Sequence, residues 1–327
     1  MFDVISFGEA MCRLSTTEFE RFEQATNLKM DAGGAEANVV VGTARLGLQS
    51  AWVSLLPENA LGYSVRNKIR TAGVDTSMVK FVGRGRMGLY WVEFGANPRR
   101  TKVLYDRKDS AISRIIEGDI DWNRVMKTRV FHTSGITPAL SDQCKKATFD
   151  AVKAAKGSGA LVSFDVNYRN KLWTKEEAAE TIRPLMEYID ILITTEEDTA
   201  LVFDITGDSY EEVARKIYDE YKCPITAITI RENVTIWKNY WTAIAFDGNR
   251  VYRDKKYDLE IVDRFGGGDS FSAGFIYGYL SKGDVQEALR YGNAFSALKH
   301  SNRTDFNWSS LQEVENLLEQ DSLRVER

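Results

Sequence analysis

Short apolar runs alternate along this chain with segments of helical periodicity, and this rhythm limits the possible folds more than any other feature. The runs are continuously apolar, as at residues 51–55 and 225–230, rather than alternating between apolar and polar residues. Continuously apolar strands are typical of parallel sheets that are covered on both faces. The sequence therefore predicts an α/β domain with helices on both sides of a mostly parallel central sheet.

The predicted strands occupy residues 4–7, 51–55, 129–132, 161–165, 189–193, 225–230 and 242–246. The predicted helices occupy residues 36–46, 62–72, 142–156, 175–186, 210–221, 269–280, 285–300 and 310–319. In sheets of this kind, ligands bind beyond the carboxyl ends of the strands. We therefore expect Gly8, Glu9, Asp165 and the glycine-rich segment 266–268 to lie near a ligand.

Two segments, at about residues 12–31 and 80–109, break this rhythm because they are richer in charged and aromatic residues. Residues 88–94 and 101–107 alternate like exposed strands, and Gly-Ala-Asn-Pro between them is typical of a turn. We expect a small β-sheet that projects from a main domain of residues 1–11, 32–79 and 110–327 and can close over a substrate. An ordinary surface hairpin is the alternative that periodicity leaves open.

Three consecutive glycines, Gly266, Gly267 and Gly268, stand directly before Asp269 and a small-residue apolar run that predicts a buried helix. The backbone N–H groups of such a loop and helix start can surround an anion. Negative charge is favoured at a helix start, so we expect Asp269 to be ionised and able to accept a proton. This pairing suits phosphoryl transfer to a hydroxyl group. The alternative is a glycine turn with Asp269 as a helix cap.

The charge balance argues against a nucleic-acid or membrane partner. Lys and Arg number 43 against 47 Asp and Glu, which leaves a net charge of −4 over 327 residues. No apolar run is long enough to cross a bilayer, and the first residues predict a strand rather than a signal peptide. Cys12, Cys144 and Cys223 are widely spaced and odd in number, as in proteins of a reducing compartment. We therefore expect a cytoplasmic protein.

Several enzyme classes lack their characteristic residues in this chain. His132 and His300 are the only histidines, so a multi-histidine metal site is impossible, and we expect His132 to be structural. No cysteine pair has zinc-site spacing. The phosphate-binding motif of P-loop NTPases, the catalytic motifs of protein kinases and the dinucleotide fingerprint of dehydrogenases are also missing.

The chain resembles the pfkB, or ribokinase-type, carbohydrate kinases along essentially its whole length. Two signatures carry this resemblance: Gly-Gly-Ala-Glu-Ala-Asn-Val at 33–39 with Ala-Arg-Leu-Gly at 44–47, and the block 263–274. Segments 103–111, 135–141 and 164–173 narrow the match to 2-keto-3-deoxygluconate kinases. The resemblance implies a ribokinase-like three-layer α/β/α domain with a small β-sheet lid.

This resemblance also implies a reaction. ATP would phosphorylate 2-keto-3-deoxygluconate at its C6 hydroxyl, giving 2-keto-3-deoxy-6-phosphogluconate and ADP. Asp269 would act as the base, and the N–H groups of Gly266, Gly267 and Gly268 would form the anion hole. Mg²⁺ would arrive with ATP and keep several waters, so no directly ligating metal cage is expected; Asp198 could reach the ion through water.

By resemblance, the sugar would be held by residues of both signatures, of the projecting strands and of the segment after residue 165. They are Gly33, Gly34, Asn38, Tyr90, Tyr105, Arg107, Asn167 and Arg169. Two arginines would suit the carboxylate of a sugar acid, since the guanidinium group forms paired hydrogen bonds with carboxylates. The alternative for both arginines is an ordinary solvated surface position.

The nucleotide side departs from the family pattern. The expected cofactor-binding residues are Thr195, Asp198, Thr229, Arg231, Gly266, Gly268 and Asn293. Thr195 and Asp198 replace the usual Asn and Glu, and Arg231 stands near a usual glycine-rich turn. Arg264 and Phe265 replace two threonines of the usual loop, which puts any monovalent-cation site in question.

Three questions stay open at the level of sequence. Another sugar kinase of this family, such as a fructokinase, and a catalytically weak sugar-acid sensor are the competing functions. Gluconate- and galactonate-derived substrates differ in one inverted hydroxyl, which changes only a contact or two. The exposed strands of the small sheet favour a homo-oligomer.

Overall fold

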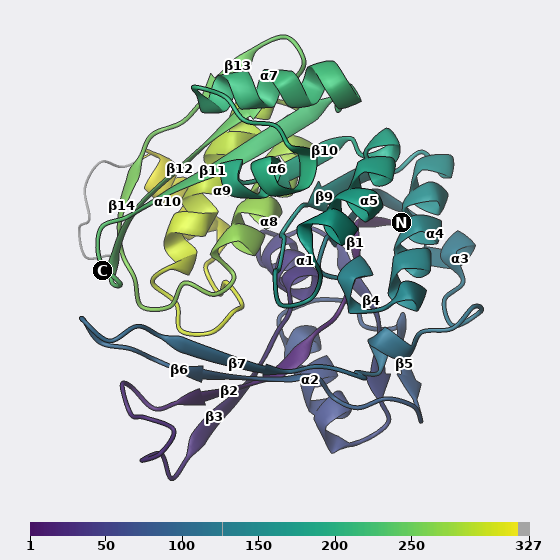
Figure 1. Cartoon of the computed structure of the whole chain (residues 1–327), viewed down its shortest axis with the longest axis vertical. Helices are drawn as coiled ribbons and strands as arrows, with labels where there is room; N and C mark the ends of the chain where they lie inside the picture. Colours follow the sequence, from purple (N-terminus) through teal and green to yellow (C-terminus); the bar gives the residue numbers. More distant parts are fainter. Residues whose placement is uncertain (126, 320–327) are drawn as a thin grey trace.

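A twisted sheet of ten strands runs through the centre of the computed structural model, which describes residues 1–125 and 127–319 (Figure 1). Its strands lie in the order β13-β12-β11-β10-β9-β8-β1-β4-β5, and β14 also pairs with β12. The parallel part comprises β5 (Val79–Val82), β4 (Ser50–Pro57), β1 (Phe2–Phe7), β8 (Thr128–Ser134), β9 (Leu161–Asp165), β10 (Ile191–Thr194) and β11 (Ile225–Asn233). An antiparallel edge follows, with β12 (Lys238–Phe246), β13 (Val251–Arg253) and β14 (Tyr257–Glu260).

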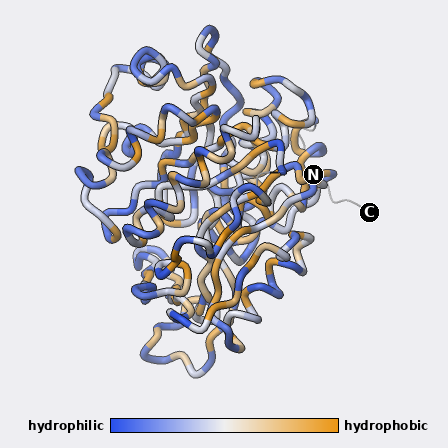
Figure 2. Tube along the Cα trace, turned by 90° about the vertical axis from the view of Figure 1, so that its right-hand side faces the viewer, coloured by the Kyte–Doolittle hydropathy of each residue, from blue (hydrophilic) through white to orange (hydrophobic). Residues whose placement is uncertain are grey.

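Helices cover both faces of this sheet, as the continuous apolar strands predict. One face packs against α1 (Ala35–Arg45), α2 (Ala60–Thr71), α8 (Gly267–Lys282), α9 (Val285–Lys299) and α10 (Leu311–Glu319). The other packs against α3 (Trp122–Val125), α4 (Asp142–Gly157), α5 (Lys175–Leu185), α6 (Glu196–Phe203) and α7 (Tyr210–Tyr221). Val4 of β1 belongs to one core and its neighbour Ile5 to the other, so the strand is apolar on both faces. Hydrophobic residues gather in the interior of the chain trace, and hydrophilic residues are frequent in its outer loops (Figure 2).

The small residues of α8 allow it to lie close to α9. A Cβ atom on Gly274 would come within 2.5 Å of the Tyr291 carbonyl oxygen, and one on Gly278 within 2.7 Å of the Ala288 Cα. Helix α8 is buried between α9, α1 and the sheet, and for this reason it is apolar on nearly all sides. This packing fixes the helix whose first residues form the glycine loop.

A second, separate sheet has four strands in the order β3-β2-β6-β7. These strands are β2 (Met11–Thr16), β3 (Leu28–Gly33), β6 (Leu89–Glu93) and β7 (Lys102–Asp106). Figure 1 shows this small sheet below the central sheet, with α2 beside it, and β3 leads into α1. The ribokinase-like α/β fold with a small separate sheet is thus confirmed. Strand β5, at the start of the second aromatic-rich segment, pairs with β4 in the central sheet instead.

Candidate active site

A cavity of about 1020 Å³ opens between the small sheet and the carboxyl ends of the central strands. Its lining includes Glu9 after β1, and Tyr90 and Tyr105 on β6 and β7. All the residues that the sequence predicts for sugar binding line this one cavity: Gly33, Gly34, Asn38, Tyr90, Tyr105, Arg107, Asn167 and Arg169. Segments far apart in the sequence therefore meet at a single site, although their contacts with a sugar stay a prediction.

A second cavity, of about 520 Å³, adjoins the first. Predicted nucleotide residues line it, namely Thr195, Asp198, Thr229, Arg231, Gly266 and Gly268, and so does Gly267 of the predicted anion hole. Asp269 lines both cavities, together with Asn167, Arg169, Phe265 and Gly266. A carboxylate between two neighbouring cavities is well placed to act on a group passed from one to the other.

Asn293 does not reach either cavity in this structure. It lies fully buried within α9, where its amide donates a hydrogen bond to Asp254 at 3.0 Å. The sequence placed it near the nucleotide only by resemblance. Its observed position favours the alternative of a buried polar residue that ties α9 to the loop between β13 and β14.

Asp269 lies in the first turn of α8, half-buried, and the Asn38 amide donates a hydrogen bond to its Oδ2 atom at 2.6 Å. Burial raises the pKa of Asp269 to about 7, the Asn38 hydrogen bond opposes this shift, and nearby Asp305 adds to it. Asp269 is therefore less readily ionised than the helix start alone would make it, because burial opposes the charged form. A pKa near neutrality suits a group that takes up a proton during a reaction.

Gly266 makes the turn that leads into α8. Its φ angle of +78° is in the left-handed region, and a Cβ atom there would lie 2.1 Å from the Asp305 carbonyl oxygen. Only glycine meets both conditions without strain. Gly268, by contrast, is exposed and has open space where a Cβ atom would be. The first-turn N–H groups of a helix have no intrahelical acceptor, so a helix start can bind an anion. Here the Gly267 N–H makes a long contact, 3.3 Å, with the Arg264 carbonyl oxygen, which an anion would have to replace.

Neighbouring protein atoms leave no room for a side chain at Gly33 or Gly34. A Cβ atom on Gly33 would come within 2.3 Å of the Tyr90 hydroxyl oxygen, and one on Gly34 within 2.0 Å of the Glu9 carbonyl oxygen. Their contact with a sugar therefore stays a prediction, while their lack of a side chain has a structural reason. They are required for the joining of β3, α1 and the end of β1, and they still line the cavity.

The two predicted arginines have different electrostatic surroundings. Arg107 Nε donates to Glu9 Oε2 at 2.8 Å, and a second guanidinium nitrogen contacts the same oxygen. Glu9 is 3% exposed and lines the cavity, so the charge of Arg107 is already balanced. Arg169 is exposed and donates to the Tyr168 carbonyl oxygen at 3.0 Å. Among residues 1–125 and 127–319, no carboxylate forms an ion pair with Arg169, although its charge acts to lower the pKa values of Asp198, Asp165 and Asp269.

Two tyrosines form the part of the cavity wall that belongs to the small sheet. The Tyr90 and Tyr105 rings are stacked, with centroids 5.9 Å apart and an interplanar angle of 21°. Tyr90 is buried, whereas Tyr105 is 45% exposed and has the Lys171 ammonium 5.8 Å from its ring centroid. The predicted strand alternation thus puts both rings on the face that lines the cavity.

The nucleotide side contains an unusual helix start. Thr195 caps α6, its Oγ1 atom accepting a hydrogen bond from the Asp198 N–H at 3.0 Å. Burial raises the pKa of Asp198 to about 6, and Arg169 opposes the shift. The Thr229 hydroxyl donates a hydrogen bond to the Thr194 carbonyl oxygen at 3.4 Å. Arg231 is exposed on β11. Thr195 therefore has a structural role as the helix cap, and Asp198 and Arg231 are among the charged residues that line the cavity.

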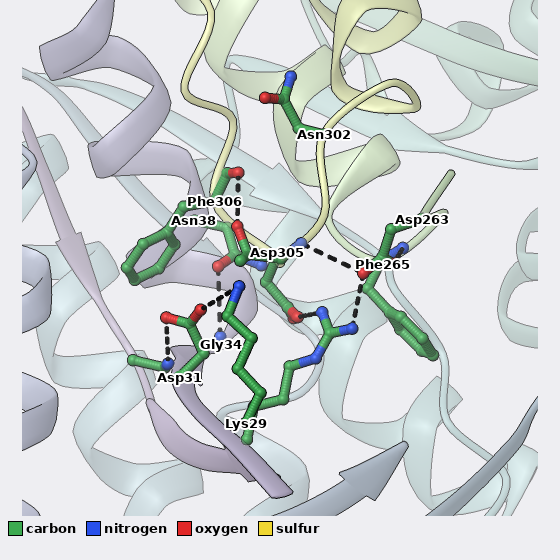
Figure 3. A network of polar contacts seen from close by, with 12 residues as sticks. Lys29, Asp31, Gly34, Asn38, Asp263, Phe265, Asn302, Asp305 and Phe306 are labelled. Carbon is green, nitrogen blue, oxygen red and sulfur yellow. Dashed lines mark hydrogen bonds and ion pairs between the residues drawn. The ribbon is translucent and has the colours of Figure 1, made fainter. Parts of the chain in front are cut away.

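An ion-pair cluster that the sequence did not predict lies directly behind the glycine loop. Arg13 on β2, 2% exposed, donates to Asp263 at 2.6 Å and to Asp305 at 2.5 Å (Figure 3). Burial alone would lower the pKa of Arg13, but Asp305 and Asp263 raise it above its usual value. The Arg13 guanidinium also lies 5.1 Å from the Phe265 ring centroid. Phe265, which departs from the family loop, thus packs against a cation from the small sheet.

Comparisons with known proteins agree with this arrangement. The model of the pfkB family carbohydrate kinases matches residues 1–306. The chain is 34% identical to the 2-dehydro-3-deoxygalactonokinase of Haloferax volcanii over 99% of both chains. It is 29% identical to the 5-dehydro-2-deoxygluconokinase of Bacillus licheniformis, over 92% of this chain and 91% of that protein. In the described residues, no helix has the length and apolarity needed to cross a membrane.

A solved structure shows the same fold. The crystal structure of 2-dehydro-3-deoxygluconokinase from Thermotoga maritima matches with a TM-score of 0.95, 39% sequence identity and 98% coverage of both chains. The two sequence signatures, the two-sheet architecture and the paired cavities around Asp269 are all consistent with this relationship. This chain therefore belongs to the pfkB family of carbohydrate kinases.

Proposed function

We propose that this kinase transfers the γ-phosphoryl group of ATP to the C6 hydroxyl of 2-keto-3-deoxygluconate. The observation that carries the proposal is the position of Asp269, which lines both cavities and has a pKa of about 7. A sugar in the larger cavity and a triphosphate in the smaller one would meet at this carboxylate. The relatives named for 2-dehydro-3-deoxy sugar acids, at 34% and 39% identity, support the substrate class.

In the proposed reaction, Asp269 takes the proton of the C6 hydroxyl as the oxygen attacks the γ-phosphorus. The bond between that phosphorus and the bridging oxygen of ADP breaks, which gives ADP, the 6-phosphorylated sugar acid and a proton. The N–H groups at Gly266, Gly267 and Gly268 would offset the charge on the transferring group. The Asn38 hydrogen bond to Oδ2 would direct the other carboxylate oxygen toward the hydroxyl.

Mg²⁺ bound with ATP would screen the charge of the phosphates. Asp165 and Asp198 both line the smaller cavity. Burial raises the pKa of Asp165 well above its usual value, and Asp269 and Asp198 add to the shift. Among the described residues no three His, Cys, Asp or Glu side chains are grouped as metal ligands, so the residues present fit an ion held mainly by ATP and water, with Asp165 and Asp198 nearby. Arg231 and Arg264, which line the same cavity, would contact phosphate oxygens.

The carboxylate of the sugar acid would be held by Arg169, whose charge has no ion-pair partner within the described chain. Arg107, already paired with Glu9, would offer its remaining N–H groups to neutral oxygens of the sugar. Tyr90 and Tyr105 would cover the sugar from β6 and β7, so we also propose that residues 12–31 and 80–109 act as a lid. A homo-oligomer and a cytoplasmic location stay predictions.

The test is ADP formation by the purified protein with Mg-ATP. We expect strong preference for 2-keto-3-deoxygluconate, or its galactonate-derived epimer, over fructose, ribose and a control without sugar. Preference for a neutral sugar would contradict the proposed substrate and favour a fructokinase-like enzyme. Sugar-acid binding without turnover would favour a sensor.

A further inference from the structure

Lys299, the last residue of α9, is the feature of this site that the proposed reaction leaves unused. Its side chain is fully buried, at 0% exposure. Its ammonium donates to two backbone carbonyl oxygens, that of Asp263 at 3.2 Å and that of Asn302 at 3.1 Å. Lysines are almost never fully buried unless they are paired. A fully buried ammonium group that donates to backbone carbonyl oxygens is therefore unusual, and a specific role would explain it.

The surroundings of Lys299 form a charge-balanced cluster. Burial lowers the pKa of the Lys299 ammonium, whereas Asp263 and Asp305 act to raise it. Both of these carboxylates are also bonded by Arg13. Figure 3 shows Asp263 and Asp305 on either side of the shared guanidinium. Two cations and two carboxylates thus lie together, and loss of either cation would leave a net negative charge.

This cluster supports the glycine loop from behind. Asp263 accepts hydrogen bonds from the Phe265 N–H at 3.0 Å and from the Thr304 N–H at 3.2 Å. Gly266, which follows Phe265, lies so close to Asp305 that a Cβ atom on it would come within 2.1 Å of the Asp305 carbonyl oxygen. The same backbone segment that receives the Lys299 ammonium therefore continues, within three residues, into the anion-binding turn.

We propose that the Lys299 ammonium is a built-in monovalent cation that holds the Asp263 and Asn302 carbonyl groups together and so positions the glycine loop for phosphoryl transfer. Lys299 acts as a positioning residue, and this role rests on the proposed function of the loop. Two carbonyl oxygens facing one positive centre are ligands that a small free cation also uses. Because the side chain fills that place, the wild-type enzyme needs no monovalent cation from solution.

The alternative is that Lys299 merely stabilises the fold, and Lys299→Met separates the two roles. Methionine is one atom shorter than lysine and uncharged, so it leaves room for a small cation at the position of the ammonium. The experiment measures kcat, sugar KM and melting temperature in potassium, ammonium and tetramethylammonium chloride at equal ionic strength. Lys153→Met, at an exposed position of α4, is the matched control.

We expect the wild type and Lys153→Met to have the same kcat in all three salts. Lys299→Met should lose about 10- to 100-fold in kcat, as misplaced groups do, with little change in sugar KM. Ammonium, and to a lesser degree potassium, should restore most of this loss and raise the melting temperature of this variant only. Tetramethylammonium, which is too large for the position, should do neither.

The proposal is overturned if the wild type requires potassium or ammonium, if Lys299→Met keeps the wild-type kcat, or if its loss of kcat is restored by no small cation. Should Lys299→Met fail to fold, Lys299→Gln, which keeps a donor but removes the charge, is judged by the same results. If the wild type turns over no sugar, the proposed function fails by itself. The selective effect of ammonium on the melting temperature then still decides whether Lys299 occupies a cation position.

Discussion

The side-chain amide of Asn38 lies 2.6 Å from the carboxylate of Asp269, although 231 positions separate the two residues in the sequence. They start α1 and α8, which run side by side. One turn farther along each helix, Gly42 faces Ala273, and a Cβ atom on Gly42 would lie 2.6 Å from that of Ala273. Close helix packing therefore brings the two sequence signatures together and fixes one oxygen of the proposed base.

Replacement of Asn38 by alanine should move the acidic limb of the pH–rate profile to higher pH. The Asn38 hydrogen bond lowers the pKa of Asp269, which burial raises to about 7, so its loss lets that pKa rise further. The proposed base must be unprotonated, so kcat should fall at a higher pH than in the wild type. The measurement is kcat from about pH 5 to pH 9, with Asn67→Ala on α2 as control. An unchanged limb would separate Asn38 from the titrating group.

Asp269→Asn should stabilise the folded protein, and the gain should grow with pH. The carboxyl group has an ordinary pKa of 3.8 and a pKa of about 7 in the folded protein. The folded state therefore binds more protons between these values, and it loses stability as the pH rises through them. An asparagine at position 269 does not titrate, so the variant does not lose this stability as the pH rises. Melting temperatures at about pH 4 and pH 8 test the prediction. A difference between variant and wild type that is the same at both would contradict it.

Arg169→Ala should weaken the binding of the sugar acid more than that of a neutral sugar. Loss of a charge-assisted pair with a carboxylate should raise KM for the acid by about 10- to 100-fold. Arg70→Ala, at an exposed position of α2, serves as the control for a lost positive charge. Equal effects on acidic and neutral sugars would show that Arg169 does not bind the carboxylate.

Gly266→Ala and Gly268→Ala form a matched pair in the glycine loop. Alanine at 266 has to adopt a φ of +78° with its Cβ atom against the Asp305 carbonyl group. This strain should cost about 1–3 kcal/mol in stability and should lower kcat by displacing the loop. Alanine at 268 meets open space and should leave stability nearly unchanged. Thermal unfolding and ADP formation distinguish them, and equal stability of both variants would refute the strain argument.

The fold was largely predictable because its signals are local. Continuous apolar strands, helix periodicity and the glycine block each lie within a short stretch, and helix α7 begins and ends at the predicted residues 210 and 221. Helix α6 was missed: it has eight residues, and its best signal is the cap at Thr195 before three acidic residues. Such short helices offer too few turns for periodicity to detect.

The membership of the site was predictable, but its electrostatics were not. The sequence motifs identified most of the site residues that line the two cavities. They did not predict the ion pairs of Arg13 with Asp263 and Asp305, which are 250 and 292 positions away in the sequence. No local pattern records such contacts. The charge state of Asp269 likewise depends on burial, which only the packed structure defines. The position of Glu9 after β1 predicted that it lies near a ligand. Its ion pair with Arg107 is seen only in the folded structure.

The most direct test of the account is ADP formation by Asp269→Asn with saturating Mg-ATP and 2-keto-3-deoxygluconate, beside calorimetric binding of the same sugar acid. We expect kcat to fall by about 10²- to 10⁴-fold, as loss of a general base does, while the sugar acid still binds. The exposed Asp142→Asn variant should behave as the wild type. Substantial turnover by Asp269→Asn would contradict the assignment of this carboxylate as the base.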